Sequence, residues 1–105
     1  MFFLMEQVSL FNHFTIMKAT IKATDLLFNK SVELECSIRK DVSASVELVR
    51  VAKANSKRIV SELRLSFGEA SLELISYGRT IATGKMTNNV FAGGRPNVVP
   101  DQQAA

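Results

Sequence analysis

Apolar residues return at steps of three, four or seven positions over most of the chain between residues 3 and 81. This spacing places apolar side chains along one face of a helix, which predicts amphipathic helices that pack on one another. Both prolines, Pro96 and Pro100, lie beyond this region. The pattern runs through two sets of positions: Phe3, Leu10, Phe14, Met17, Ile21 and Phe28, and then Val42, Val46, Val49, Ser56, Val60, Leu63, Phe67, Ala70, Leu74, Tyr77 and Ile81.

A strand-like alternation competes with the helical pattern in two places. Apolar and polar residues alternate over 32–38, and again over 63–75, where Gly68 could turn the chain between two short strands. Neither Asn-Gly nor Asp-Gly, the strongest short hairpin signals, occurs in the sequence. The helical interpretation therefore leads, and both segments remain open between helix and strand.

These patterns predict an all-α fold, either an antiparallel helical hairpin or a small three-helix bundle, with a disordered C-terminal tail. We expect coiled-coil-like helical segments at 4–23, 25–55 and 57–84, because no isolated helix can bury such an apolar stripe. The alternative is an α+β fold with a short antiparallel sheet. Residues 1–86 would form a single helical domain, and residues 87–105, rich in turn-forming residues, a flexible tail.

The composition excludes some kinds of functional site but says less about the fold. A chain of 105 residues has room for one domain, and its single cysteine excludes an internal disulfide and a multi-cysteine metal site. The formal charge is +3, and this excess lies entirely in residues 53–105, which hold seven basic and four acidic residues. So small an excess favours acidic partners only weakly.

Candidate catalytic groups find no matching partners in the sequence. Cys36 is the one thiol and His13 the one histidine, and nothing in their spacing brings them together. Residues 78–85 resemble a phosphate-binding loop superficially, but five residues rather than four separate Gly78 from Gly84, and Met86 replaces the required hydroxyl. We therefore expect no catalytic, cofactor-binding or metal-ligating residues, and a protein that is not an enzyme.

The apolar stripe in the second half is the leading candidate for an interface. Large buried side chains at such a seam each contribute strongly to stability, so we expect their loss to dissociate or unfold the protein. The partner would be a second copy of the chain, in a homo-oligomer, or another protein. The expected seam consists of Val42, Val46, Val49, Val60, Leu63, Phe67 and Leu74.

A cluster of basic residues supports an alternative function. Arg50, Lys53 and Lys57 recur at helical steps, Arg58 is adjacent to Lys57, and no acidic residue lies between Glu47 and Glu62. On one helix face these cations could contact phosphate groups, which predicts a small basic module associated with nucleic acid.

The N-terminal residues 2–17 are apolar and rich in phenylalanine. No basic residue precedes them and polar residues interrupt them, so they match neither a secretory signal nor a membrane-spanning helix. They could contact a partner or, less expectedly, a membrane surface. We expect a cytoplasmic protein, in which the lone thiol stays reduced.

Overall fold

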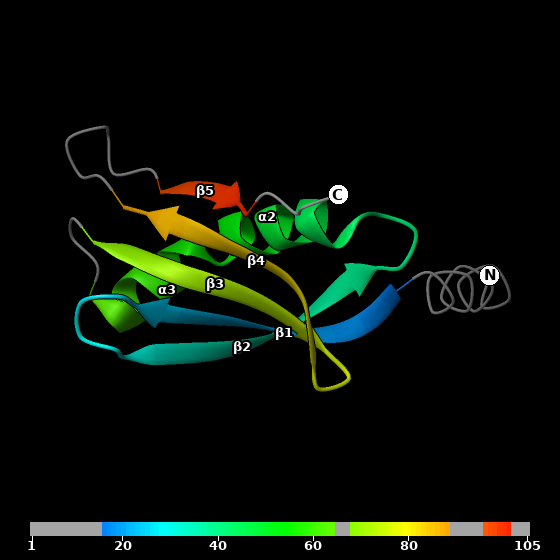
Figure 1. Cartoon of the computed structure of the whole chain (residues 1–105), viewed down its shortest axis with the longest axis horizontal. Coiled ribbons are helices and arrows are strands. Elements are labelled where there is room, and N and C mark those ends of the chain that lie inside the picture. The colour runs from blue at the N-terminus through cyan, green and yellow to red at the C-terminus, as the bar shows by residue number, and fades with distance from the viewer. Residues whose placement is uncertain (1–15, 65–67, 89–95, 102–105) are drawn as a thin grey trace, which may run out of the picture.

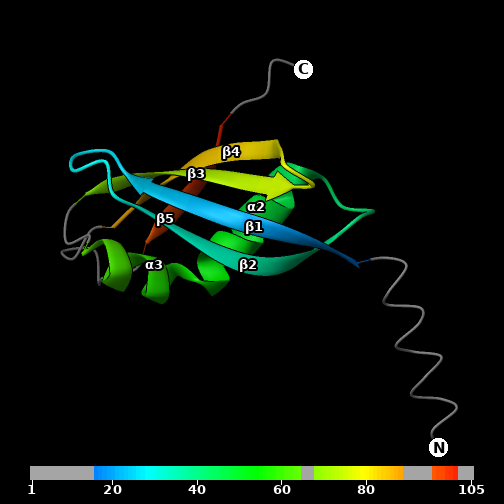
Figure 2. The same ribbon diagram turned by 90° about the horizontal axis from the view of Figure 1, so that it is seen from below.

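The computed structural model describes residues 16–64, 68–88 and 96–101. In these residues the chain forms a five-stranded antiparallel sheet with the strand order β2-β1-β3-β4-β5, and two helices (Figure 1). Both helices lie on one face of the sheet, as Figure 2 shows. In chain order the elements are β1 (Ile16–Asp25), β2 (Ser31–Arg39), α2 (Ala44–Ala54), α3 (Ser56–Leu63), β3 (Glu69–Ser76), β4 (Arg79–Thr87) and β5 (Asn97–Pro100).

The prediction of an all-α bundle with coiled-coil-like helices is wrong. The described parts of two expected helices, 4–23 and 57–84, consist largely of strand, and the segment 25–55 contains β2 before α2 begins. The error has a simple cause: a step of four positions is an even step, so Met17 and Ile21 fit one face of a strand as well as one face of a helix. The structure is nearer to the α+β alternative, but with a larger sheet than that alternative supposed.

Along the strands, buried residues alternate with residues that are more exposed. Along β1, the side chains of Ala19, Ile21 and Ala23 are buried, whereas the residues between them are only partly covered. The segment 32–38, left open between helix and strand, is a strand, and its residues Leu34 and Ile38 point into the core. The core lies between this face of the sheet and the helices and comprises Ala19, Ile21, Ala23, Leu34, Ile38, Leu48, Val51, Ala52, Ile59, Leu63, Ala70, Leu72, Leu74, Ala82, Met86 and Val98.

The expected disordered tail also contains regular structure. Residues 97–100 form β5, which pairs with β4 and buries Val98. Gly84 makes this packing possible: a Cβ atom there would lie 2.7 Å from the Val99 carbonyl oxygen and 3.0 Å from Leu48. The glycine of the apparent phosphate loop is therefore a packing residue in the middle of β4, beneath α2 and beside β5.

The hairpin between β3 and β4 turns at Tyr77 and Gly78. Both residues have positive φ angles, 52° and 75°, as a two-residue type I′ turn requires. A tyrosine rarely occupies such a position, because its Cβ atom disfavours positive φ. This turn therefore lacks the Asn-Gly or Asp-Gly dipeptide that would have predicted it from the sequence.

Candidate functional site

Helix α2 is seated on the sheet by an apolar face that contains one carboxylate. Ser43 precedes the helix, and its Oγ accepts a hydrogen bond from the Val46 backbone N–H at 3.4 Å. The inward face then presents Leu48, Val51 and Ala52 to the core. Glu47 lies on the same side and is fully buried, so its charge requires partners within the protein.

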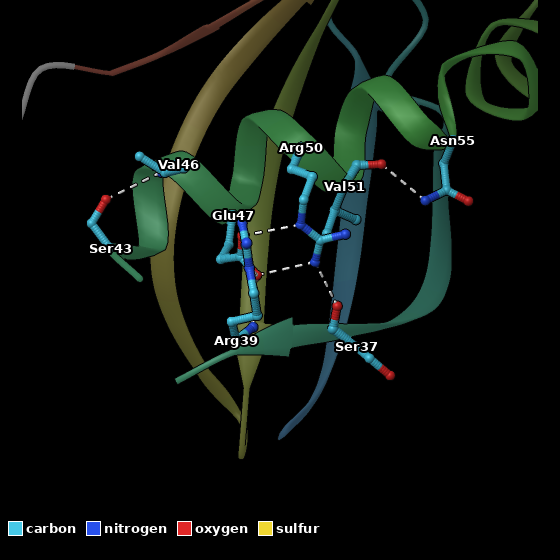
Figure 3. Close-up of polar contacts among 8 residues, drawn as sticks. All are labelled: Ser37, Arg39, Ser43, Val46, Glu47, Arg50, Val51 and Asn55. Carbon is cyan, nitrogen blue, oxygen red and sulfur yellow. Dashed lines mark hydrogen bonds and ion pairs between the residues drawn. The ribbon is translucent and has the colours of Figure 1, made fainter. Parts of the chain in front are cut away.

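Two arginines supply these partners, as Figure 3 shows. Arg39, at the end of β2, donates to the Glu47 carboxylate from its Nη2 at 2.9 Å, from its Nε, and from its backbone N–H. Arg50, one helical turn beyond Glu47, donates from Nε and Nη2 at 3.0 Å each. Hydrogen bonds from Arg39, and then those from Arg50, hold the pKa of Glu47 far below its usual range despite its burial. The carboxylate therefore stays ionised.

The cluster also protects the end of an edge strand. The Arg39 backbone N–H and the Ser37 carbonyl face away from β1, toward the open edge of the sheet. Glu47 accepts from the first of these groups, and Arg50 Nη2 donates to the second at 2.9 Å. Helix α2 is thus tied to β2 by side chains that occupy the places where another strand would pair.

A shallow hollow of about 480 Å³ lies on the outer side of this cluster, between α2, the end of β2 and the end of β5. Val46, Val49 and Pro100 give it an apolar lining. Val46 is 53% exposed, which is unusual for a valine on a packed helix. The charged side chains around the hollow are all basic, namely Arg39, Arg50 and Lys53.

The hollow is lined by residues of both the expected apolar seam and the expected basic cluster. Val46 and Val49 come from the expected apolar seam, and Arg50 and Lys53 from the expected basic cluster. The sequence pattern alone predicts two separate sites, an apolar seam and a basic cluster, whereas the structure places these four residues together.

The other members of the seam do not share one face. Leu63 and Leu74 are buried in the core of this chain, and Leu74 belongs to a strand. Val42 and Val60 are half-buried, the first before α2 and the second on α3. Phe67 lies outside the described residues.

The basic cluster is divided by a break between the helices. Asn55 ends α2, and its side-chain amide donates to the Val51 carbonyl at 2.9 Å. Lys57 and Arg58 follow on α3, where both are exposed. Arg58 lies 3.8 Å from the Glu62 carboxylate, so part of its charge is balanced.

Cys36 is the one thiol of the chain. Cys36 faces the core side of β2, and burial raises the pKa of its thiol, which makes it a poor nucleophile. His13 lies outside the described residues. In residues 16–64, 68–88 and 96–101, no three histidine, cysteine or acidic side chains gather as a metal site would require, and neither helix has the length and hydropathy needed to cross a membrane.

Sequence reasoning missed three contributors to this site: Arg39, Glu47 and Pro100. The spacing of Glu47 and Arg50 was a usable signal, because residues three apart on a helix can pair. The roles of Arg39 and Pro100 depend on the sheet, which the helical interpretation did not include. The chain matches no known family model, curated protein or solved structure, so its own residues carry the functional argument.

Proposed function

We propose that the protein is a non-enzymatic interaction module, and that it binds a segment of another protein carrying apolar and acidic side chains in the α2 hollow. The observation that carries this proposal is the combination of an apolar lining, formed by the exposed Val46 and the half-buried Val49 and Pro100, with charged neighbours that are all basic. An exposed apolar patch with a polar rim is typical of interaction sites.

Charge favours an acidic partner. Arg39, Arg50 and Lys53 contribute three positive charges around the hollow, and Glu47 offsets one of them. Guanidinium groups suit carboxylates especially well, because their N–H groups match both carboxylate oxygens. Acidic side chains on the partner would therefore meet an excess of positive charge.

Pre-organisation supports binding at the same place. Glu47 already holds Arg39 and Arg50 in fixed positions, while about half of each arginine side chain remains exposed. A partner therefore need not restrict two freely moving arginines, which lowers the entropic cost of association. The hollow is shallow and open, which suits an extended peptide better than an enclosed small molecule.

Self-association and a cytoplasmic location, both expected from the sequence, stay predictions. Self-association would bring a second copy to the same face, and a cytoplasmic location would keep Cys36 reduced. Nucleic-acid binding through Arg50, Lys53, Lys57 and Arg58 is the alternative function, but Arg50 already bonds Glu47 and the four residues are split between two helices.

The test is a selection of random peptides displayed on phage against the folded full-length chain. Peptides that are enriched would be synthesised and titrated into ¹⁵N-labelled protein, with amide chemical shifts recorded for every assigned residue. We expect enriched peptides to combine acidic with aliphatic or aromatic residues, and to shift the amides of Val46, Val49 and Lys53.

Two pairs of variants sharpen the test. Val46→Asp and Lys53→Glu should each weaken peptide binding by about tenfold or more, since they place acidic charge at the hollow. Val99→Asp changes a valine of nearly equal exposure on the opposite face of the sheet, and Lys57→Glu changes a lysine on α3; both should bind as the wild type does. Equal binding by all four variants, or the absence of enriched acidic peptides, would contradict the proposal. So would concentration-dependent self-association that Val46→Asp abolishes while no peptide binds.

A further inference from the structure

The turn between β1 and β2 exposes three consecutive large apolar residues. Leu26, Leu27 and Phe28 are 52%, 80% and 77% exposed. Turns at strand ends are usually built from Gly, Asn, Asp, Ser or Pro, and a run of exposed apolar residues there is exceptional unless it has a function. The turn projects from one end of the sheet (Figures 1 and 2).

Hydrogen bonds fix the shape of this turn from below. Asp25 is buried, and its Oδ1 accepts from the Leu27 backbone N–H at 2.8 Å. The Asp25 N–H donates to the Lys30 carbonyl at 2.7 Å, and the Asp25 carbonyl accepts from the Asn29 N–H at 2.9 Å. Asn29 takes the left-handed conformation, with φ of 56°, which asparagine tolerates better than most residues. The apolar side chains are therefore presented by a pre-formed turn.

The form of this surface favours a lipid bilayer over a protein pocket. Leu26, Leu27 and Phe28 are consecutive and exposed at the tip of a turn. The interface of a bilayer is fluid and can surround all three. Lys30 follows the tip and is exposed, so its ammonium group could remain with the lipid phosphates while the apolar side chains enter the acyl region.

We propose that the Leu26–Phe28 tip inserts into the interfacial region of an anionic phospholipid membrane, with Lys30 at the headgroup level. This membrane contact is independent of the α2 hollow, which lies between α2, the end of β2 and β5. Three apolar side chains and one cation give reversible binding of the kind that a single lipid anchor gives, rather than permanent attachment.

The opposite end of the sheet provides a matched control. The β3–β4 turn carries Tyr77, which is 86% exposed and is flanked by Ser76 and Gly78. It is one exposed aromatic residue on a polar turn, in contrast to the three apolar residues of the tip. Since the chain contains no tryptophan, a tryptophan placed at either turn is the sole indole reporter.

The experiment uses the full chain with Phe28→Trp or, separately, Tyr77→Trp. Each variant is mixed with vesicles made from equal parts of phosphatidylcholine and phosphatidylserine, and with the same vesicles carrying brominated acyl chains. We expect the tryptophan at residue 28 to shift its emission to the blue and to be quenched by the brominated lipid. We expect the tryptophan at residue 77 to show neither change.

Co-sedimentation with the same vesicles completes the test. The double variant Leu27→Ser, Phe28→Ser should lose about tenfold or more of the wild-type affinity, because it removes the two most exposed apolar side chains of the tip. Its far-ultraviolet circular dichroism should match that of the wild type, since both side chains are exposed. The proposal would be overturned if the tryptophan at residue 28 stayed in water, if both reporters responded equally, or if a folded double variant sedimented like the wild type.

Discussion

The two helices each carry one glutamate paired with arginine, and the pairs differ in almost every physical respect. Glu47 on α2 is fully buried and is bonded by Arg39 and Arg50. Glu62 on α3 is about half exposed, and Arg58 lies 3.8 Å away. In the sequence the two pairs look alike, since each spans three or four positions of a helix.

The difference shows that burial, rather than spacing, decides what an ion pair does. An exposed pair is solvated and screened, and contributes about 0–1 kcal/mol. A buried carboxylate has lost its hydration, so hydrogen bonds from protein groups must take the place of all the lost water contacts. Glu47 can therefore anchor α2 to β2, whereas the Arg58–Glu62 pair can contribute little to stability.

The largest effect should come from Glu47→Gln. The amide is neutral, and its NH₂ group would face the guanidinium donors of Arg39 and Arg50, so we expect a loss of about 2–4 kcal/mol in the free energy of unfolding. This is a large share of the stability of a small domain. Urea denaturation followed by circular dichroism would measure it. A loss below about 0.5 kcal/mol, the size expected for an ordinary surface substitution, would contradict the anchoring role.

A smaller effect should follow from Arg50→Met. This change removes two hydrogen bonds to Glu47 and one to the Ser37 carbonyl, but Arg39 still compensates the carboxylate. We expect a loss of about 1–3 kcal/mol, measured in the same way. Amide hydrogen exchange near residues 37–39 should also become faster, because the outer edge of β2 loses part of its cover. If stability and exchange both stayed at wild-type values, Arg50 would have no part in tying the helix to the strand.

The smallest effect should come from Glu62→Gln. Its partner is a solvated arginine at 3.8 Å, so we expect a change of less than about 0.5 kcal/mol. The variant is the matched control for Glu47→Gln, since both exchange a helical glutamate for its amide. Equal losses in the two variants would remove the distinction between the pairs.

The sequence predicts a strand only where the buried residues of that strand stand out as a clear apolar pattern. The alternation over 32–38 fits β2, because polar and apolar residues there follow a period of two, but the sequence alone left this segment open between helix and strand. Strand β1 was misassigned, since its small core residues Ala19 and Ala23 add little to an apolar pattern. The β3–β4 turn was missed because Tyr77 occupies a position usually filled by Asn, Asp or Gly.

The candidate site was predictable in part. Val46, Val49, Arg50 and Lys53 all lie on one helix that the sequence pattern predicts, and all four line the hollow. Arg39 and Pro100 come from β2 and β5, so their presence depends on long-range strand pairing that local periodicity does not encode. The apolar tip Leu26–Phe28 was not predicted either, because the helical interpretation assigned Phe28 to the apolar stripe and placed no turn at these residues.

The most direct test of the anchoring role is a pH titration of the glutamate side-chain carboxyl carbons by NMR. Hydrogen bonds from Arg39 and Arg50 lower the pKa of Glu47 in the folded state, so its carboxyl signal should remain that of the ionised form well below the ordinary glutamate pKa of about 4.3. Because the folded-state pKa is the lower one, this stabilisation is complete above the unfolded pKa and is lost as pH falls toward the folded value. A Glu47 signal that titrates near the ordinary value would show that the carboxylate is not held by the two arginines.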